Sequence, residues 1–279
     1  MPPLVRCLTV LLFMTVLFST ADAATSRRVF NLNPDWRFLR DDAPRAMEPG
    51  FDDTPWSQVS LPHTWNDIDT FDNFGQGGHT GETDLWTGVA WYRKSFTLPA
   101  SAEGQRVVVE FEGVRQIADV YFNGQHLGQN KTGFIPFGFD LTPHLRASGE
   151  PNVLVVRADN RFADHFEGDT PWHHPNWHPP HGGIYRNVRL HLMDPVHVTL
   201  PLYSNLQTEG IYARAPVITA EQAEVVVSAE IANTSDQPFA GEVSFAVVDR
   251  DGHTVASARQ NAALDSSSRT KVTTTLEVA

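Results

Sequence analysis

The sequence DNRFADHFEGDTPWHHPNWHPPHGGIYR, Asp159 to Arg186, separates two strand-like runs, Val153–Val156 and Val188–Leu192. It shows neither the period-2 alternation of a strand nor the apolar face of a helix, although it is rich in Trp, His and Pro. Loops this long inside a compact domain are usually functional or disordered, and disorder goes with few aromatic residues. The segment therefore predicts a structured binding loop held by two neighbouring strands.

Short strand-like runs with turn signals extend from this loop in both directions. Tyr92, Phe96 and Leu98 alternate onto one face of one such run. Asn123-Gly124 predicts a tight hairpin turn, because such turns need residues that tolerate positive φ. Further runs are Val107–Glu112, Ile117–Phe122 and Phe134–Leu141. Many short strands at these intervals are typical of a β-sandwich.

Helical signals are weak by comparison. No stretch of ten or more residues shows a convincing 3.6-residue period. A single turn is possible at Thr142–Arg146, where Thr142 would cap the turn and Pro143 would occupy its first position. The sequence therefore predicts an all-β fold in which residues 24–195 form a jelly-roll β-sandwich.

The chain before this region is dense in Pro and Asp, and residues 29–65 look loop-like. An extended segment ending in Leu61-Pro62 favours an edge strand, because Pro cannot donate to a ladder. Trp56 and Trp65, which bracket it, are expected to pack in the core. Residues 67–87 hold several Gly, but no apolar strand precedes them and no helical pattern follows. A surface loop is therefore expected there, not a phosphate-binding loop.

Residues 196–279 form a second predicted unit without Trp. Its alternating runs are Ala223–Ile231, Glu242–Val248 and Lys271–Val278, with turns at 233–236 and 249–252. This pattern is typical of an immunoglobulin-like β-sandwich, which usually takes about 100 residues. Only 84 residues follow Pro195 (279 minus 195). The second sandwich is therefore expected to be incomplete.

The first 23 residues predict export. Met1–Arg6 is a short basic start, Leu8–Phe18 is apolar, and residues 21–23 (ADA) have the small-x-small pattern of a cleavage site. We therefore expect a signal peptide at 1–23, a mature chain from Ala24, and a periplasmic or extracellular location. No later segment approaches the about 20 apolar residues that span a bilayer, so no membrane contact is expected after cleavage.

Charge and cysteine content narrow the possible partners. The formal net charge is -12, and an acidic chain without a basic cluster repels phosphate backbones, which argues against nucleic acid. The one cysteine, Cys7, lies inside the predicted signal peptide. The mature fold is therefore expected to rest on its apolar core, without disulfides.

Several motifs follow one another in a recognisable order. They are LPHTWN at 61–66, WYRK at 91–94, FEGV at 111–114, VYFNG at 120–124, GFIPF at 133–137, DLT at 140–142, DN at 159–160 and GIYR at 183–186. Together they resemble the amino-terminal sugar-binding domain of glycoside hydrolase family 2, which includes β-galactosidases, β-mannosidases and β-glucuronidases. The resemblance covers roughly Val29 to Asp194 and implies a galactose-binding-like jelly roll. The residues that follow are similar to the family's immunoglobulin-like second domain.

The resemblance implies a retaining exo-glycosidase, in which one carboxyl protonates the leaving oxygen and another attacks the anomeric carbon. In this family both are glutamates on a (β/α)8 barrel that follows the second domain, and such a barrel takes about 250 residues. The sequence contains no Asn-Glu pair like the family's acid/base motif and no alternation of strands and helices. The chain alone is therefore expected to be inactive, with no catalytic residue and no cofactor.

The resemblance also implies that the loop at 162–183 reaches the rim of the sugar pocket. In the β-galactosidases an acidic residue just before an aromatic residue of this loop touches the sugar. Asp169, before Trp172, and Asn176, beside Trp177, are the candidate matches; the alternative is a solvated or loop-tying role. Trp172 and Trp177 either stack on a pyranose ring or pack against the sandwich and hold the loop to it.

Histidines in the same loop raise the question of a metal site, since imidazole is the commonest zinc ligand. They are His173, His174, His178 and His181. No Cys accompanies them, Pro stiffens the intervening chain, and the spacing matches no helical pair. We therefore expect no metal, and we count His181 among the substrate-binding candidates.

Arg186 ends the quoted segment. It is expected to pair with a buried carboxylate, such as Asp159 or Asp119, in preference to substrate.

Two functions fit these observations. The first is the amino-terminal, non-catalytic portion of an exported family 2 glycoside hydrolase that supports the sugar pocket, with a terminal β-galactoside or related glycan as partner. The alternative is a stand-alone secreted carbohydrate-binding module. A structural role, in a homo-oligomer or against a catalytic barrel, is a third possibility.

Overall fold

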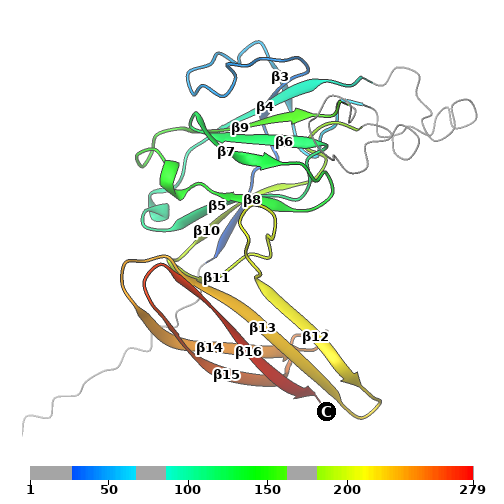
Figure 1. The fold of residues 1–279 in the computed structure, drawn as a ribbon, viewed down its shortest axis with the longest axis vertical. Coiled ribbons are helices and arrows are strands. Elements are labelled where there is room, and N and C mark those ends of the chain that lie inside the picture. The colour runs from blue at the N-terminus through cyan, green and yellow to red at the C-terminus, as the bar shows by residue number, and fades with distance from the viewer. Residues whose placement is uncertain (1–26, 67–85, 162–180, 279) are drawn as a thin grey trace, which may run out of the picture.

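In a computed structural model of the chain, the described residues are 27–66, 86–161 and 181–278. Within these ranges the fold is all β, and its only helical elements are the 3-10 turns η2 (Ala100–Ala102) and η3 (Thr142–His144). The described residues contain no helix long and apolar enough to cross a membrane. Figure 1 shows two β units arranged one above the other, which meet near β11 (Val196–Val198). The predicted all-β fold is confirmed.

The first unit is a sandwich of two antiparallel sheets. The six-stranded sheet has the order β3 (Ser57–Val59), β2 (Trp36–Leu39), β4 (Val89–Phe96), β9 (Asn152–Asp159), β6 (Ile117–Phe122) and β7 (Gln125–Asn130). The four-stranded sheet has the order β1 (Arg28–Asn31), β10 (Val188–Met193), β5 (Arg106–Phe111) and β8 (Phe137–Asp140). Strands far apart in sequence are neighbours, as in a jelly roll.

The main core lies between the two sheets. Its largest fully buried side chains include Trp36, Tyr92, Phe111, Phe137 and Leu154. Because side chains alternate along a strand, every second residue of β9 points into this core. The residues between them, Val153 and Val155, point the other way and pack with Trp56 and Trp91 in a second cluster. The six-stranded sheet is therefore covered on both faces.

Two details of the sequence interpretation are confirmed. Asn123 and Gly124 have φ of 50° and 87° and join β6 to β7 as the expected hairpin. β3 is an edge strand as expected, although it ends at Val59, before Leu61-Pro62, and both Trp residues that bracket its region are buried.

Two other details are wrong. Residues 29–65 are not uniformly loop-like, because β1, β2 and β3 lie within them and pair with distant strands. Thr142 does not cap η3: the N-cap is Leu141, and the Thr142 hydroxyl accepts a hydrogen bond from the N–H of Val107 at 2.9 Å. In both cases a partner far along the chain sets the local structure.

The second unit contains β12 (Ile211–Ile218), β13 (Ala223–Asn233), β14 (Phe239–Val248), β15 (Thr254–Leu264) and β16 (Ser268–Val278). β13 is central: it pairs with β16 on one side and with β11 and β12 on the other. β14 and β15 form a separate two-stranded sheet. Their apolar side chains, with Phe245 buried, face those of β13 and β16. The three predicted runs correspond to β13, β14 and β16.

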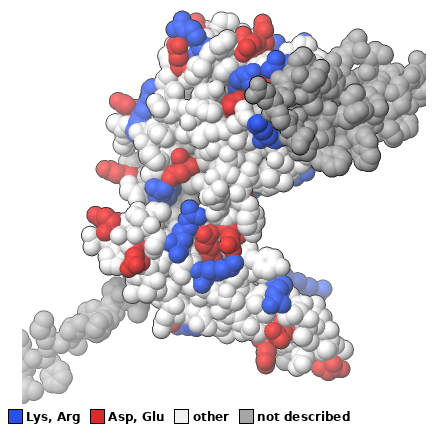
Figure 2. Space-filling model, viewed as in Figure 1, with Lys and Arg blue, Asp and Glu red and all other residues white. Residues whose placement is uncertain are grey.

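The two units are joined by polar and apolar contacts. Asn130 Nδ2 donates to Ser204 Oγ at 2.7 Å, and Asn205 Nδ2 donates to the carbonyl of Gln129 at 3.1 Å. Leu202 is fully buried against the first sandwich. On the face drawn in Figure 2, acidic and basic side chains of the described residues are interspersed and form no continuous basic stripe.

Candidate functional site

Residues next to the ends of the described segments meet at one edge of the first sandwich. Asn66 Nδ2 donates to the carbonyl of Trp86 at 3.1 Å, and Asn66 Oδ1 accepts from the N–H of Trp86 at 3.1 Å. Asn160 Nδ2 donates to the same carbonyl at 3.3 Å, while Asn160 Oδ1 accepts from the N–H of Gly88 at 2.9 Å. An amide can donate and accept at once, so two Asn side chains hold three chain segments together.

Gly182 joins this group through its backbone. Its carbonyl accepts from the N–H of Trp65 at 3.1 Å, and the N–H of His63 donates to the carbonyl of Ile184 at 2.8 Å. A Cβ at Gly182 would lie 1.7 Å from Cζ2 of Trp65, so only glycine lets the chain pass against this ring. Trp65, Asn66, Trp86, Asn160 and Gly182 together form what we call the loop base.

Aromatic rings pack inside the loop base. The Trp65 ring meets Trp86 edge-on at 5.5 Å between centroids and stacks on Phe38 at 6.3 Å. The guanidinium of Arg40 lies over Trp86 at 5.6 Å. Trp65 is buried, but Trp86 is half-buried. Trp86 is thus the ring through which the described part of this edge can offer an apolar face to a ligand.

His63 lies beneath the loop base. Its Nδ1 is 2.8 Å from the hydroxyl of Tyr92, and its ring contacts Phe38 at 4.6 Å between centroids. Burial lowers the pKa of His63, and burial also raises the pKa of Tyr92. At neutral pH both side chains are therefore uncharged, as a hydrogen-bonded pair in an apolar setting should be.

His63 should make the protein less stable in mild acid. The unfolded chain binds a proton at this residue near pH 6.5, the usual value for histidine, whereas burial keeps the folded imidazole neutral to lower pH. This contribution to stability is complete above about pH 6.5 and is lost as the pH falls toward the lowered pKa of the folded state. We expect the free energy of unfolding, measured in urea, to be smaller at pH 5 than at pH 7.5.

In the variant His63→Gln, the free energy of unfolding should fall less between pH 7.5 and pH 5 than it does in the wild type. His197, whose pKa is also lowered by burial, should preserve part of it. His144→Gln, which replaces an exposed side chain, is the matched control and should behave like the wild type. An unchanged pH dependence in His63→Gln would contradict this account.

The carboxylate of Asp159 anchors the residue next to Asn160. Its side chain is fully buried. It accepts from Arg161 Nη2 at 2.6 Å, from the N–H of Arg161 at 3.1 Å and from Arg157 Nη2 at 3.3 Å. The hydrogen bond to Asp159 raises the pKa of Arg161. This ion pair fixes the end of β9, and with it the position of Asn160.

Four of the five predicted sugar contacts, Asp169, Trp172, Asn176 and Trp177, lie outside the described residues. The fifth, His181, is half-buried and directly precedes Gly182 of the loop base. Its assignment as a sugar contact stays a prediction. Asn66, Trp86 and Asn160 were not selected from the sequence as site residues. The one sequence feature that could have indicated them is their position: each is an Asn or a Trp at the end of a segment without strand or helix periodicity.

The expected pairing of Arg186 is wrong. Asp159 forms ion pairs with Arg157 and Arg161. Asp119 pairs with Arg157, with Oδ2 of Asp119 at 3.5 Å from Nη1 of Arg157. Arg186 is exposed, with its guanidinium 5.6 Å from the centroid of the Tyr185 ring. Closer arginines compete for the two carboxylates, which sequence spacing alone does not reveal.

Metal-ligand geometry is not found in the described part of the chain. No group of three or more His, Cys, Asp or Glu side chains there is arranged to hold a metal ion. His173, His174 and His178 lie outside the described residues.

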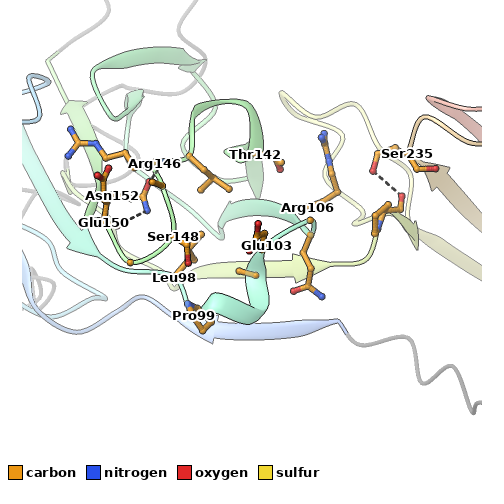
Figure 3. Close-up of a pocket in the computed structure, with 18 residues that line it drawn as sticks. Leu98, Pro99, Glu103, Arg106, Thr142, Arg146, Ser148, Glu150, Asn152 and Ser235 are labelled. Atoms are coloured by element: carbon orange, nitrogen blue, oxygen red, sulfur yellow. Dashed lines mark hydrogen bonds between the residues drawn. The ribbon is translucent and has the colours of Figure 1, made fainter.

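A cavity of about 440 Å³ lies elsewhere, bordered by η2, residues 145–150 and the turn at Thr234–Ser235 (Figure 3). It shares no residue with the loop base. Two of its polar lining residues already have partners, since Arg106 pairs with Asp140 and Asn152 accepts from Asn123 Nδ2 at 2.8 Å. Nothing in its lining indicates a saccharide, so the loop base is the candidate site.

The first sandwich is a jelly roll, and the loop base places the half-buried Trp86 at one of its edges. The family model described as "Glycosyl hydrolases family 2, sugar binding domain" matches residues 29–195. The chain therefore belongs to glycoside hydrolase family 2, and it corresponds to the amino-terminal, non-catalytic portion of such enzymes.

Relatives with known names support this placement. The chain is 48% identical over 257 residues to a protein named beta-glucuronidase from Formosa agariphila, covering 91% of this chain and 26% of that protein. It is 33% identical over 243 residues to "Beta-galactosidase BoGH2A" from Bacteroides ovatus, covering 87% of this chain and 26% of the relative. A solved structure described as a beta-glucuronidase from glycoside hydrolase family 2 superimposes with a TM-score of 0.84 at 48% identity, covering 91% of this chain and 27% of that one. The chain thus spans about a quarter of the length of these relatives.

Proposed function

We propose that this chain supports the sugar pocket of an exported enzyme that hydrolyses terminal β-glycosides with retention. The loop base is the observation that carries the proposal. Its Asn160 and Gly182 fix the chain on either side of residues 162–180, which hold four of the five predicted sugar contacts. A pocket needs such a support, because a contact residue must be held within a fraction of an ångström of its productive position.

The glycone proposed first is a β-glucuronide. Its support is the 48% identity to the beta-glucuronidase of Formosa agariphila, against 33% to the Bacteroides ovatus beta-galactosidase. A β-galactoside is the second candidate and was the expectation from the sequence. Export to the periplasm or outside the cell rests on residues 1–23 and is part of the proposal.

The 279-residue chain should bind a saccharide without cleaving it. We expect no turnover of nitrophenyl β-glucuronide or β-galactoside, because the two catalytic glutamates of the family belong to its barrel. Titration calorimetry with the matching methyl glycosides should show weak binding, which Trp177→Ala removes. Turnover by the pure chain would contradict the non-catalytic role. If Trp177→Ala bound the saccharide with wild-type affinity, Trp177 would not be a sugar contact.

A stand-alone carbohydrate-binding module is the second candidate function. It is favoured by the half-buried Trp86 and the complete apolar core of the first sandwich, which need no barrel to form. Binding by the chain alone that is as tight as binding by a barrel-containing form would favour it. Much tighter binding by the barrel-containing form would favour the first proposal, as would contact of the chain with a barrel.

A further inference from the structure

One strand of the second unit is exposed along its whole length. All eight residues of β12 are exposed, which is true of no other strand in the described ranges. Ile211, Tyr212 and Ile218 are 61%, 57% and 72% exposed. Apolar side chains that gather on a surface mark a contact with another molecule more often than isolated ones do.

β12 also has an unpaired edge. It pairs with β13 on one side, and no strand of the described part of the chain pairs with its other side, which Figure 1 shows at the border of the second unit. The N–H of Glu230 donates to the carbonyl of Gly210 at 2.9 Å. Because backbone groups of successive residues point alternately to the two sides of a strand, Ile211 and Ala213 direct their N–H and C=O groups away from β13. Such an edge is a template for another strand.

Two side chains of β12 can interact across such a contact. Tyr212 and Arg214, the one charged residue of the strand, stand opposite Ser228 and Val226 of β13. Val227, which points the other way, packs against β14 and β15. Since residues two apart share a face of a strand, Tyr212 and Arg214 lie together on the face turned away from β14 and β15.

We propose that β12 pairs with β12 of a second copy of the chain, antiparallel and about a twofold axis at Ala213. In this register Ala213 exchanges two hydrogen bonds with its own counterpart, and Ile211 of each copy pairs with Ala215 of the other. Tyr212 of each copy then stands opposite Arg214 of the other. Residues opposed in this way have Cα atoms about 4.5 Å apart, which is close enough for a guanidinium to lie over a phenol ring.

The sequence of β12 favours its own copy as the partner. A ring and a cation two residues apart are met in reverse order by an antiparallel copy, so both Tyr–Arg pairs form at once. A register centred on Arg214 would instead oppose two guanidinium groups, which is destabilising. Contacts in which the same patch serves on both subunits are the commonest kind in homodimers. The contact uses neither the loop base nor a saccharide, so it stands apart from the proposed function.

The pairing should end at Pro216. The register of β12 against β13 shifts between Arg214 and Val217, and Pro216 has no N–H to donate. A ladder confined to residues 211–215 is short. The dimer is therefore expected to be weak and to depend on the protein concentration.

Sedimentation velocity of the 279-residue chain, loaded from about 1 µM to about 100 µM, tests the proposal. We expect monomer to give way to dimer across this range. Ala213→Pro should raise the dissociation constant about tenfold or more, because it removes the two central hydrogen bonds. The N–H of Ala213 points away from β13, and edge strands accept Pro at such positions. The thermal midpoint of the dilute variant should therefore match that of the wild type.

Ala213→Ser, which retains the N–H, is the matched control and should dimerise like the wild type. Arg214→Ala tests the side-chain pairs without altering the backbone. It should raise the dissociation constant roughly fivefold, because two exposed cation–π contacts are lost. Its control is Arg259→Ala, since Arg259 is an exposed arginine of β15 that pairs with Glu242 at 3.2 Å within its own sheet. That variant should leave the dimer unchanged.

A chain that stays monomeric up to about 100 µM would overturn the proposal. Growth into species larger than the dimer would also overturn it, because a twofold contact closes on itself. A dimer that is unchanged in both Ala213→Pro and Arg214→Ala would show that association uses another surface. If Ala213→Pro failed to fold, the result for Arg214→Ala would decide alone.

Discussion

Gly182→Ala is expected to destabilise the first sandwich by roughly 1–3 kcal/mol, the usual cost of overpacking a filled site. A Cβ at this position would lie 1.7 Å from Cζ2 and 1.8 Å from Cε2 of Trp65. That ring cannot simply turn away, because it is buried between Phe38 and Trp86. Relief would require breaking the hydrogen bond from Trp65 N–H to the Gly182 carbonyl.

Urea unfolding of the variant, followed by Trp fluorescence, measures this loss. Gly50→Ala is the matched control: a Cβ there meets nothing within 4 Å, so it should be neutral or slightly stabilising. Weakened saccharide binding should accompany the loss in Gly182→Ala but not in Gly50→Ala. If Gly182→Ala were as stable as the wild type, the loop base would tolerate a larger distance between residue 182 and the Trp65 ring than its geometry indicates.

Asp159→Asn is expected to cost roughly 3 kcal/mol, the low end for breaking a buried ion pair, because both arginine partners keep some contact with water. The carboxylate is fully buried, whereas the side chains of Arg157 and Arg161 are 22% and 38% exposed. The amide keeps the shape of the side chain but removes the charge and turns a donor toward one guanidinium. The neighbouring Asn160 should lose its fixed position.

Thermal and urea unfolding of Asp159→Asn test this expectation. Asp251→Asn is the control, because Asp251 is 63% exposed and its contact with Arg250 is long, at 3.7 Å. An exposed pair of this kind contributes less than about 1 kcal/mol. If the two variants lost similar stability, the ion pair at the end of β9 would not anchor the loop base.

Much of the architecture could be predicted from local patterns. The Asn123-Gly124 turn was found because positive φ restricts the residue types that a hairpin accepts. Long strands such as β13 and β16 were found because their alternation covers many residues. β1 and β2, with four residues each, carry too short a pattern, and β12 lies exposed at a sheet edge without a clear alternation.

The sequence by itself determined the all-β class and the family, because the alternation of side chains, the turn residues and the ordered motifs each lie within short windows of the chain. Only the tertiary structure decided which residues make the loop base, and that the buried Arg115 has no carboxylate partner among the described residues. Asn66, Trp86 and Asn160 meet because β4 pairs with β9, and Gly183 meets Arg115 across 68 residues (183 minus 115). The physical reason is that hydrogen bonds and ion pairs act over a few ångströms of space, and sequence spacing does not give that distance.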